Sequence, residues 1–141
     1  MSTDPQLISQ HKLRQYALQA LYLLEFREDD KLTNATALEI VLDGQEIQAK
    51  NLEFLQGLVE GVLAHEAEIN KRISRHLMTD WTLSRLTSID RAILRLGSYE
   101  MLYTEIDQLI ALDESLNLAK DFSDESSTSL INGVLQNLLK S

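Results

Sequence analysis

The sequence contains no cysteine, one proline and five glycines among its 141 residues. The absence of cysteine excludes disulfides, zinc–thiolate sites and cysteine nucleophiles. The scarcity of proline and glycine, with 44% hydrophobic residues, argues against a disordered chain and against a turn-rich β-sandwich. No run approaches the roughly 18 apolar residues of a membrane helix, and the amino terminus lacks the pattern of a signal peptide. We therefore expect a cytoplasmic protein with no membrane partner.

Apolar residues recur at helical spacing along most of the chain, and no segment alternates with a period of two. The pattern predicts an all-α fold with six or seven helices. The expected segments are 9–27, 34–42, 47–77 with a break near 65–67, 87–103, 110–122 and 125–139. The first helix is expected to start at Asp4-Pro5 or at Ser9, and the last is expected to be capped by Ser123 or Asp124.

The polar segment 79–82 is expected to divide the chain into two helical bundles. The amino-terminal bundle would span residues 1–80 and the carboxyl-terminal bundle residues 81–141, together forming one domain. Trp81 falls at this boundary. We expect its large side chain to plug the junction.

The distribution of charge is uneven, although the net charge is -9. Residues 71–95 carry six basic and two acidic side chains, while both flanking regions are acidic. One interpretation is a solvated helix face whose charges pair with acidic neighbours. The other is a surface for a polyanion or an acidic partner. Composition does not choose between them.

No pattern in the sequence indicates an active site. Of the three histidines, His65 and His76 would lie about 16 Å apart on a continuous helix, too far to share a metal ion. The sequence has no nucleophile elbow, phosphate-binding loop or dinucleotide-binding motif. The serines of 123–129 are interpreted as helix-capping residues. We expect no catalysis, no cofactor and no metal.

Tyr22 lies on the polar side of the first predicted helix with Lys12, Gln15 and Gln19, and Phe26 continues this stripe. An exposed ring beside a cation and two amides suits single-stranded RNA, because the ring can stack on a base while Lys12 meets phosphate. The alternative is that Tyr22 packs under a neighbouring helix.

Four blocks of the sequence resemble the NusB family of transcription antitermination and ribosomal RNA processing factors. They occur in the family order over nearly the whole chain, at residues 19–22, 90–100, 117–125 and 131–135. The resemblance implies two antiparallel three-helix bundles. It also implies binding to the boxA element of nascent ribosomal RNA together with NusE, a small-subunit ribosomal protein that docks mainly on the carboxyl-terminal bundle. The pair would then join NusA, NusG and RNA polymerase.

The resemblance also implies a set of RNA-binding residues in two regions: Lys12, Arg14, Gln19 and Tyr22, and then Asp90, Ser126, Ser127, Leu130 and Asn132. The chain departs from the family in having few basic residues before the first helix, and in having Leu130 where relatives place an aromatic. Sparse cations predict weak RNA binding by the chain alone, with a shallow salt dependence.

Two alternatives remain open. The first is a protein-interaction module that keeps the fold without independent RNA recognition, which the acidic balance favours. The second is the related RNA-binding domain attached to certain RNA cytosine methyltransferases, although 141 residues leave no room for their catalytic domain.

Overall fold

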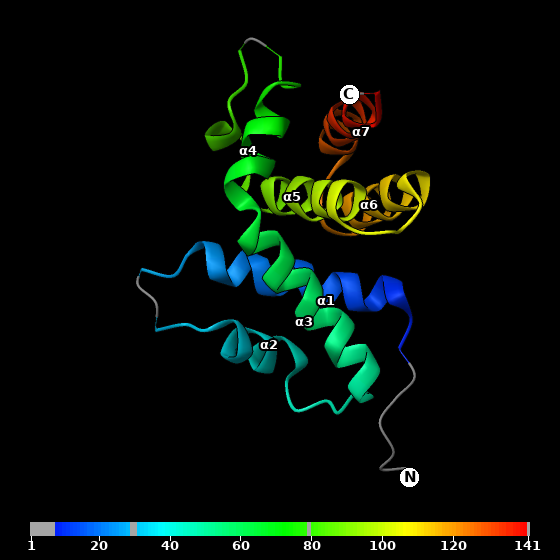
Figure 1. The fold of residues 1–141 in the computed structure, drawn as a ribbon. Helices are drawn as coiled ribbons and strands as arrows, with labels where there is room; N and C mark the ends of the chain where they lie inside the picture. Colours follow the sequence, from blue (N-terminus) through cyan, green and yellow to red (C-terminus); the bar gives the residue numbers. More distant parts are fainter. Residues whose placement is uncertain (1–7, 29–30, 79, 141) are drawn as a thin grey trace. The chain divides into compact units, whose positions relative to one another are not determined.

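The computed structural model describes residues 8–28, 31–78 and 80–140, apart from the side chain of Lys140. This part of the chain is helical and contains no strand (Figure 1). The elements are α1 (Gln10–Glu25), α2 (Asn34–Leu42), α3 (Ala49–Ala64), α4 (Glu66–Ser74), the 3-10 helix η1 (Leu83–Arg85), α5 (Ser88–Tyr103), α6 (Gln108–Phe122) and α7 (Glu125–Lys140). The all-α prediction is confirmed.

The chain forms two compact units, Met1–Glu60 and Gly61–Ser141. The division falls inside α3, whereas the sequence suggested one at 79–82. The reason lies in the last turn of α3, where a Cβ at Gly61 would collide with the ring of Tyr99 from α5. This turn packs within the second unit, although the helix that carries it begins in the first.

In the first unit, α1 buries the face that its periodicity predicted. Ser9 is the N-cap residue, and its Oγ accepts a hydrogen bond from the backbone N–H of Lys12 at 3.1 Å. The other predicted start, Asp4-Pro5, lies outside the described residues. The core stripe of α1 consists of six buried residues at helical spacing: Leu13, Tyr16, Ala17, Ala20, Leu21 and Leu24.

The predicted break near residue 65 is also confirmed. His65 separates α3 from α4, and its Nδ1 lies 2.9 Å from the carbonyl oxygen of Gly61. Its ring stacks on Tyr103 with the centroids 4.0 Å apart. The imidazole is therefore fixed within the second unit at the point where the helix is interrupted.

In the second unit, α5 is the central helix and packs against α4, α6 and α7. It buries residues on nearly all sides, among them Ile93, Leu94 and Leu96. Gly97 permits a close approach, since a Cβ there would collide with the Oγ of Ser115 from α6. The beginning of α5 lies beside the beginning of α7, where Ser127 donates a hydrogen bond to Asp90, and the candidate site lies there.

The expectation that Trp81 is a buried plug is wrong. Its side chain is 44% exposed and lies in the segment before η1. The expectation came from the position of Trp81 in the polar segment between the two expected bundles, but no helical register places this residue on a core face.

Candidate nucleic-acid interface

The polar stripe of α1 presents two aromatic rings to solvent. Tyr22 is 41% exposed and Phe26 is 57% exposed. Their centroids lie 5.0 Å apart in an edge-to-face arrangement, which orients both rings. Lys12 is exposed and Gln19 is half-buried on the same helix. We call Lys12, Gln19, Tyr22 and Phe26 the α1 face. The exposure of Tyr22 argues against the alternative in which it packs under another helix.

Arg14 does not belong to this face, which corrects the prediction for that residue. It is 2% exposed, and its guanidinium lies 5.6 Å from the centroid of the Phe54 ring of α3. A buried guanidinium against an aromatic ring stabilises the packing of α1 on α3. It is not accessible to a phosphate in this conformation.

Asp90 connects the start of α5 to the segment between α6 and α7. It is 4% exposed, and its two carboxylate oxygens accept hydrogen bonds from Ser123 Oγ at 2.8 Å and Ser127 Oγ at 2.6 Å. Thr87 caps α5 by accepting a hydrogen bond from the backbone N–H of Asp90. Hydrogen bonds to an ionised carboxylate are stronger than those between neutral groups. The side chains of Asp90 and Ser127 therefore hydrogen-bond within the protein and connect α5 to α7.

A cavity of about 270 Å³ opens next to this carboxylate. Four of the five residues predicted for the second RNA-binding region line this cavity. The fifth, Asn132, does not line it and accepts a 3.0 Å hydrogen bond from Gln136. We call this cavity the Trp81 pocket. Its lining consists of Trp81, Arg85, Leu86, Thr87, Asp90, Ser126, Ser127 and Leu130.

Trp81 and Arg85 line the Trp81 pocket, and sequence reasoning missed both as functional candidates. The guanidinium of Arg85 lies 5.8 Å from the centroid of the Trp81 ring, and its Nη1 donates a 2.7 Å hydrogen bond to the carbonyl oxygen of Asp80. A signal existed, since an arginine follows the single tryptophan by four residues inside the basic region. The interpretation of Trp81 as a plug between the two bundles concealed this signal.

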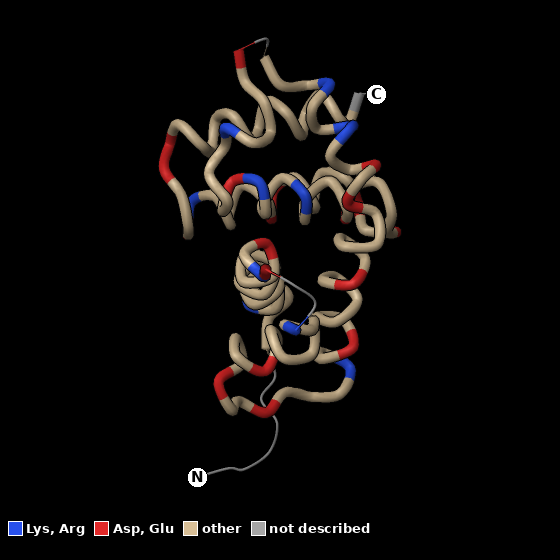
Figure 2. The backbone as a smooth tube through the Cα atoms, turned by 90° about the vertical axis from the view of Figure 1, so that its left-hand side faces the viewer, with Lys and Arg blue, Asp and Glu red and all other residues tan. Residues whose placement is uncertain are grey.

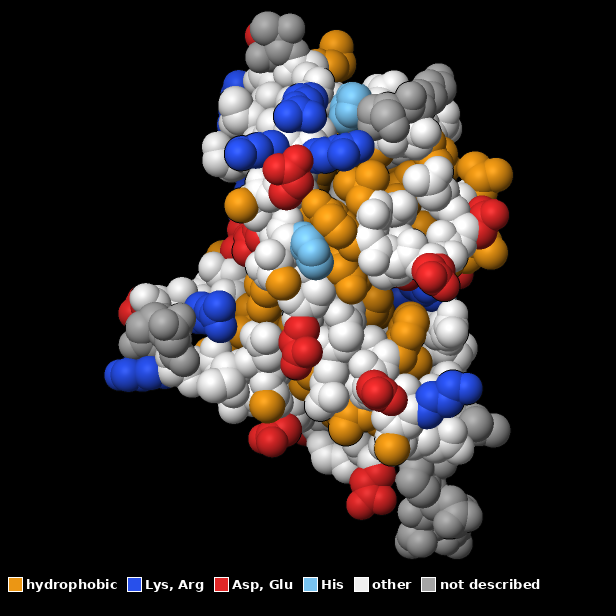
Figure 3. All heavy atoms as spheres, viewed as in Figure 1, with side chains coloured by type: hydrophobic (Ala, Val, Ile, Leu, Met, Phe, Trp, Pro, Cys, Tyr) orange, Lys and Arg blue, Asp and Glu red, His pale blue; other side chains and the backbone are white. Residues whose placement is uncertain are grey.

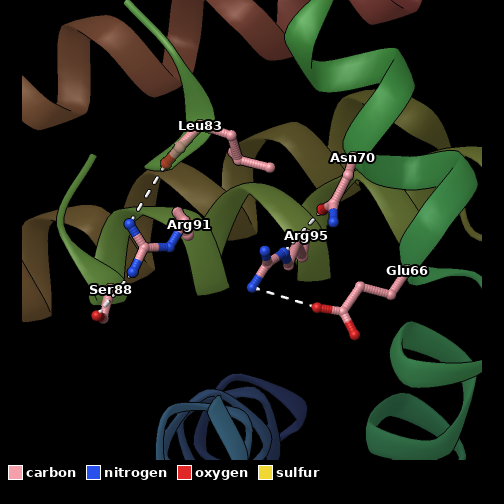
Figure 4. A network of polar contacts seen from close by, with 6 residues as sticks. All are labelled: Glu66, Asn70, Leu83, Ser88, Arg91 and Arg95. Atoms are coloured by element: carbon pink, nitrogen blue, oxygen red, sulfur yellow. Dashed lines mark hydrogen bonds and ion pairs between the residues drawn. The ribbon is translucent and has the colours of Figure 1, made fainter. Parts of the chain in front are cut away.

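The basic region 71–95 divides into internal and exposed cations. Arg91 donates hydrogen bonds to the carbonyl oxygen of Leu83 at 3.3 Å and to Ser88 Oγ at 3.0 Å (Figure 4). Arg95 donates to Asn70 Oδ1 at 2.9 Å and forms an ion pair with Glu66 at 3.5 Å. Both arginines of α5 thus support the second unit.

Lys71, Arg75 and Arg85 are exposed. Both α4 and α5 carry basic residues, and Figure 2 shows Lys and Arg positions interspersed with Asp and Glu along the backbone. Lys and Arg side chains gather over α4 in the space-filling view (Figure 3). Arg95 therefore fits the interpretation in which basic residues pair with acidic neighbours. The exposed cations fit the interpretation of a surface for a polyanion or an acidic partner.

Asp124 sets the start of α7 beside the Trp81 pocket. Its carboxylate accepts a 2.8 Å hydrogen bond from the backbone N–H of Ser127, and this bond lowers the pKa of the carboxyl below its ordinary value of 3.8. Of the two predicted caps, Asp124 serves α7, while Ser123 donates to Asp90. The cap orients the first turn of α7, which carries Ser126 and Ser127.

Metal and membrane chemistry find no support in the described ranges. Within residues 8–28, 31–78 and 80–140, no three His, Asp or Glu side chains come together in a way that could hold a metal ion. None of the helices described there has the length and apolar run needed to cross a bilayer.

A model of the NusB family matches residues 11–140. The chain belongs to the NusB family. The transcription antitermination protein NusB of Enterococcus faecalis is 37% identical to it over 139 residues, covering 94% of this chain and 90% of the relative. A structure of T. maritima NusB matches with a TM-score of 0.85 and 30% identity, covering 96% of this chain and 94% of that one.

The NusB fold is also shared with a chain in a crystal structure of antitermination factors NusB and NusE in complex with dsRNA. That match has a TM-score of 0.80 and 24% identity over 94% of this chain and 98% of the other. At this identity the likeness shows the fold. Together these comparisons confirm the resemblance on which the two-region site was predicted.

Proposed function

We propose that this chain is an RNA-binding transcription antitermination factor that binds boxA RNA of nascent ribosomal transcripts together with NusE. The pair joins NusA, NusG and RNA polymerase in the cytoplasm. Family membership and the name of the Enterococcus faecalis relative support this proposal. The protein acts by holding RNA and a partner together, so its role requires no catalysis.

The observation that carries the RNA-binding part is the exposed, oriented ring of Tyr22. Tyr22 and Phe26 form an exposed aromatic pair on α1, and base stacking on such a ring contributes about 1–3 kcal/mol. Phe26 holds the Tyr22 ring edge-to-face at 5.0 Å, which reduces the entropy lost when a base stacks. Lys12 and Gln19 supply a cation and an amide on the same helix.

The charges of the chain explain why a partner is needed. With a net charge of -9 and with Arg14 buried, few cations are available to neutralise phosphate. Each phosphate contact contributes about 0.7 to the salt dependence of single-strand binding. The chain alone therefore binds RNA weakly, and NusE supplies the missing positive charge.

The acidic side chains of the second unit favour a cationic protein partner. Glu105 and Asp113 are exposed, whereas Asp107 caps α6 by accepting a 2.8 Å hydrogen bond from Leu109. Reversing Glu105 and Asp113 to lysine is expected to slow association with NusE, because complementary charge accelerates encounter. Unchanged association kinetics would contradict this part of the proposal. Asp107 is left intact so that the helix start is preserved.

The experiment is a fluorescence anisotropy titration of labelled boxA RNA with the protein, with and without NusE, at two salt concentrations. A scrambled RNA of the same length is the control. The proposal predicts tight, sequence-selective binding when NusE is present and weak binding with a shallow salt dependence when it is absent. Loss of selectivity under every condition would contradict RNA recognition.

A second candidate function is a protein-interaction module without RNA recognition. It is favoured by the internal use of Arg14, Asp90 and Ser127, all three of which were predicted to contact RNA. In that case the scrambled and boxA RNAs would behave alike while NusE still binds. The same titration therefore separates the two functions.

A further inference from the structure

We infer that the Trp81 pocket receives one unpaired RNA base, with Arg85 meeting a phosphate beside it. The inference rests on the proposed RNA-binding function and deepens it, because it assigns Trp81 and Arg85 a role that the family resemblance did not supply. It concerns the second unit alone.

The size and lining of the pocket suit a planar, mostly apolar group. Its volume of about 270 Å³ lies just below the range of small-molecule sites, which fits a single ring system better than a longer ligand. Trp81, Leu86 and Leu130 provide aromatic and aliphatic surface, while Ser126 and Thr87 carry hydroxyl groups. A nucleobase combines the same two requirements, because its faces stack and its edges form hydrogen bonds.

Arg85 is held in position before any ligand arrives. The carbonyl of Asp80 accepts a hydrogen bond from Nη1, and the guanidinium lies over the indole. These contacts leave the side chain exposed. An arginine that is already oriented loses less entropy on binding, and its planar donors match a phosphate.

Charge distinguishes a base from a cationic side chain of a partner protein. The only carboxylate of the pocket, Asp90, is 4% exposed, and both its oxygens already accept hydrogen bonds from serine hydroxyls. It is therefore poorly placed to neutralise an incoming ammonium or guanidinium, and Arg85 repels one. A neutral ring attached to an anionic phosphate meets neither obstacle.

The test uses the emission of Trp81, which is the single tryptophan of the chain. Unlabelled boxA RNA is titrated into the wild-type protein, in the presence of NusE if tight binding requires it, with emission corrected for NusE alone. A base stacked on the indole is expected to quench the emission and to protect it from acrylamide. RNAs with one abasic site at each position in turn keep every phosphate but lack one base, so one of them should lose the quenching.

The RNA affinities of Trp81 and Arg85 variants, measured by anisotropy, complement the emission data. Trp81→Leu is expected to raise the Kd at least about fivefold, the low end of the stacking range, while Trp81→Phe restores most of the affinity. Arg85→Met is expected to reduce the salt slope by about 0.7, whereas Arg75→Met, an exposed arginine outside the pocket, leaves the emission change intact. Thermal unfolding of each variant verifies that it folds.

Three outcomes overturn the inference. Saturating RNA that leaves Trp81 emission unchanged, while Tyr22→Ala still weakens binding, removes the pocket from the site and leaves the proposed function standing. Quenching by the protein partner alone, with no further effect of RNA, assigns the pocket to a protein contact. Failure of the wild-type protein to bind RNA under any condition overturns the proposed function and the inference together.

Discussion

The α1 face and the Trp81 pocket present aromatic rings in different ways. On α1, Tyr22 and Phe26 stand on one side of a regular helix, and each is more than two-fifths exposed. In the second unit, the ring of Trp81 belongs to an irregular segment and lines a cavity whose other walls come from η1, α5 and α7. The first surface depends on one helix, whereas the second depends on tertiary structure.

This difference separates side chains that are exposed on a helix from side chains that hold the walls of a cavity together. The α1 face persists as long as α1 is folded, so its exposed side chains are free to act on a ligand. In the Trp81 pocket, Asp90 joins α5 to the start of α7 through hydrogen bonds from Ser123 and Ser127. Substitutions there are expected to act first on stability.

The largest expected effect is that of Asp90→Ala on the second unit. Removing a buried carboxylate that accepts two serine hydrogen bonds should lower the free energy of unfolding by about 2–4 kcal/mol. Chemical denaturation measures this change. Asp113→Ala, which removes an exposed carboxylate from α6, is the control and should shift stability by less than about 0.5 kcal/mol. Equal effects of the two substitutions would contradict the structural role of Asp90.

A smaller effect is expected from the neighbouring serines at the start of α7. Ser127→Ala removes the 2.6 Å hydrogen bond to Asp90 and should cost about 1–2 kcal/mol in unfolding free energy. Ser126→Ala, at an exposed position of the same turn, should cost less than about 0.5 kcal/mol. Equal losses of unfolding free energy for the two substitutions would contradict the structure, in which Ser127 bonds to Asp90 and Ser126 is exposed.

The sequence predicted the fold and the α1 face because both depend on local periodicity. The core stripe of α1, the bounds of α2 and the interruption at His65 follow from the spacing of apolar residues and from helix-ending signals. The exposure of Tyr22 follows in the same way, since it lies opposite that stripe.

Three features could not be predicted, because distant residues create them. Phe54 of α3 covers Arg14, and the sequence of α1 does not reveal this. Asp90 and Ser127 meet across 37 positions of the chain. Trp81 was predicted to plug the junction between the two bundles, and only the tertiary structure shows that it lines an open pocket. Long-range contacts thus determined which of the predicted polar residues remained available.

The two basic residues of α1 provide a test through salt dependence. Lys12→Met should reduce the salt slope of RNA binding by about 0.7, because it removes one exposed cation from the α1 face. Arg14→Met should leave the slope unchanged, because the wild-type guanidinium is buried against Phe54. Anisotropy titrations at several salt concentrations measure both slopes. A drop for Arg14→Met alone would place Arg14 on the RNA and exclude Lys12.

The smallest effect concerns the pH dependence of the cap on α7. The folded-state pKa of Asp124 is lowered, so its stabilisation is fully present above the unfolded value of 3.8 and is lost as the pH falls through the folded value. The difference in Tm between wild type and Asp124→Ala should therefore be constant near neutral pH and shrink at acidic pH. Asp124→Asn retains a capping oxygen without a charge, and its own cap should not titrate. A difference for Asp124→Ala that does not shrink on acidification would contradict the assignment.

The most direct test of the account is the effect of Tyr22→Ala on boxA RNA binding, measured by anisotropy with NusE present and compared with Tyr22→Phe. Unfolding free energies of both variants are measured in parallel. Under the proposed function the exposed ring of Tyr22 stacks on a base, so the Kd is expected to rise at least about fivefold for alanine. The proposal also predicts little change for phenylalanine and an unfolding free energy within about 0.5 kcal/mol of wild type. An unchanged Kd for Tyr22→Ala, with NusE binding intact, would contradict RNA recognition by the α1 face.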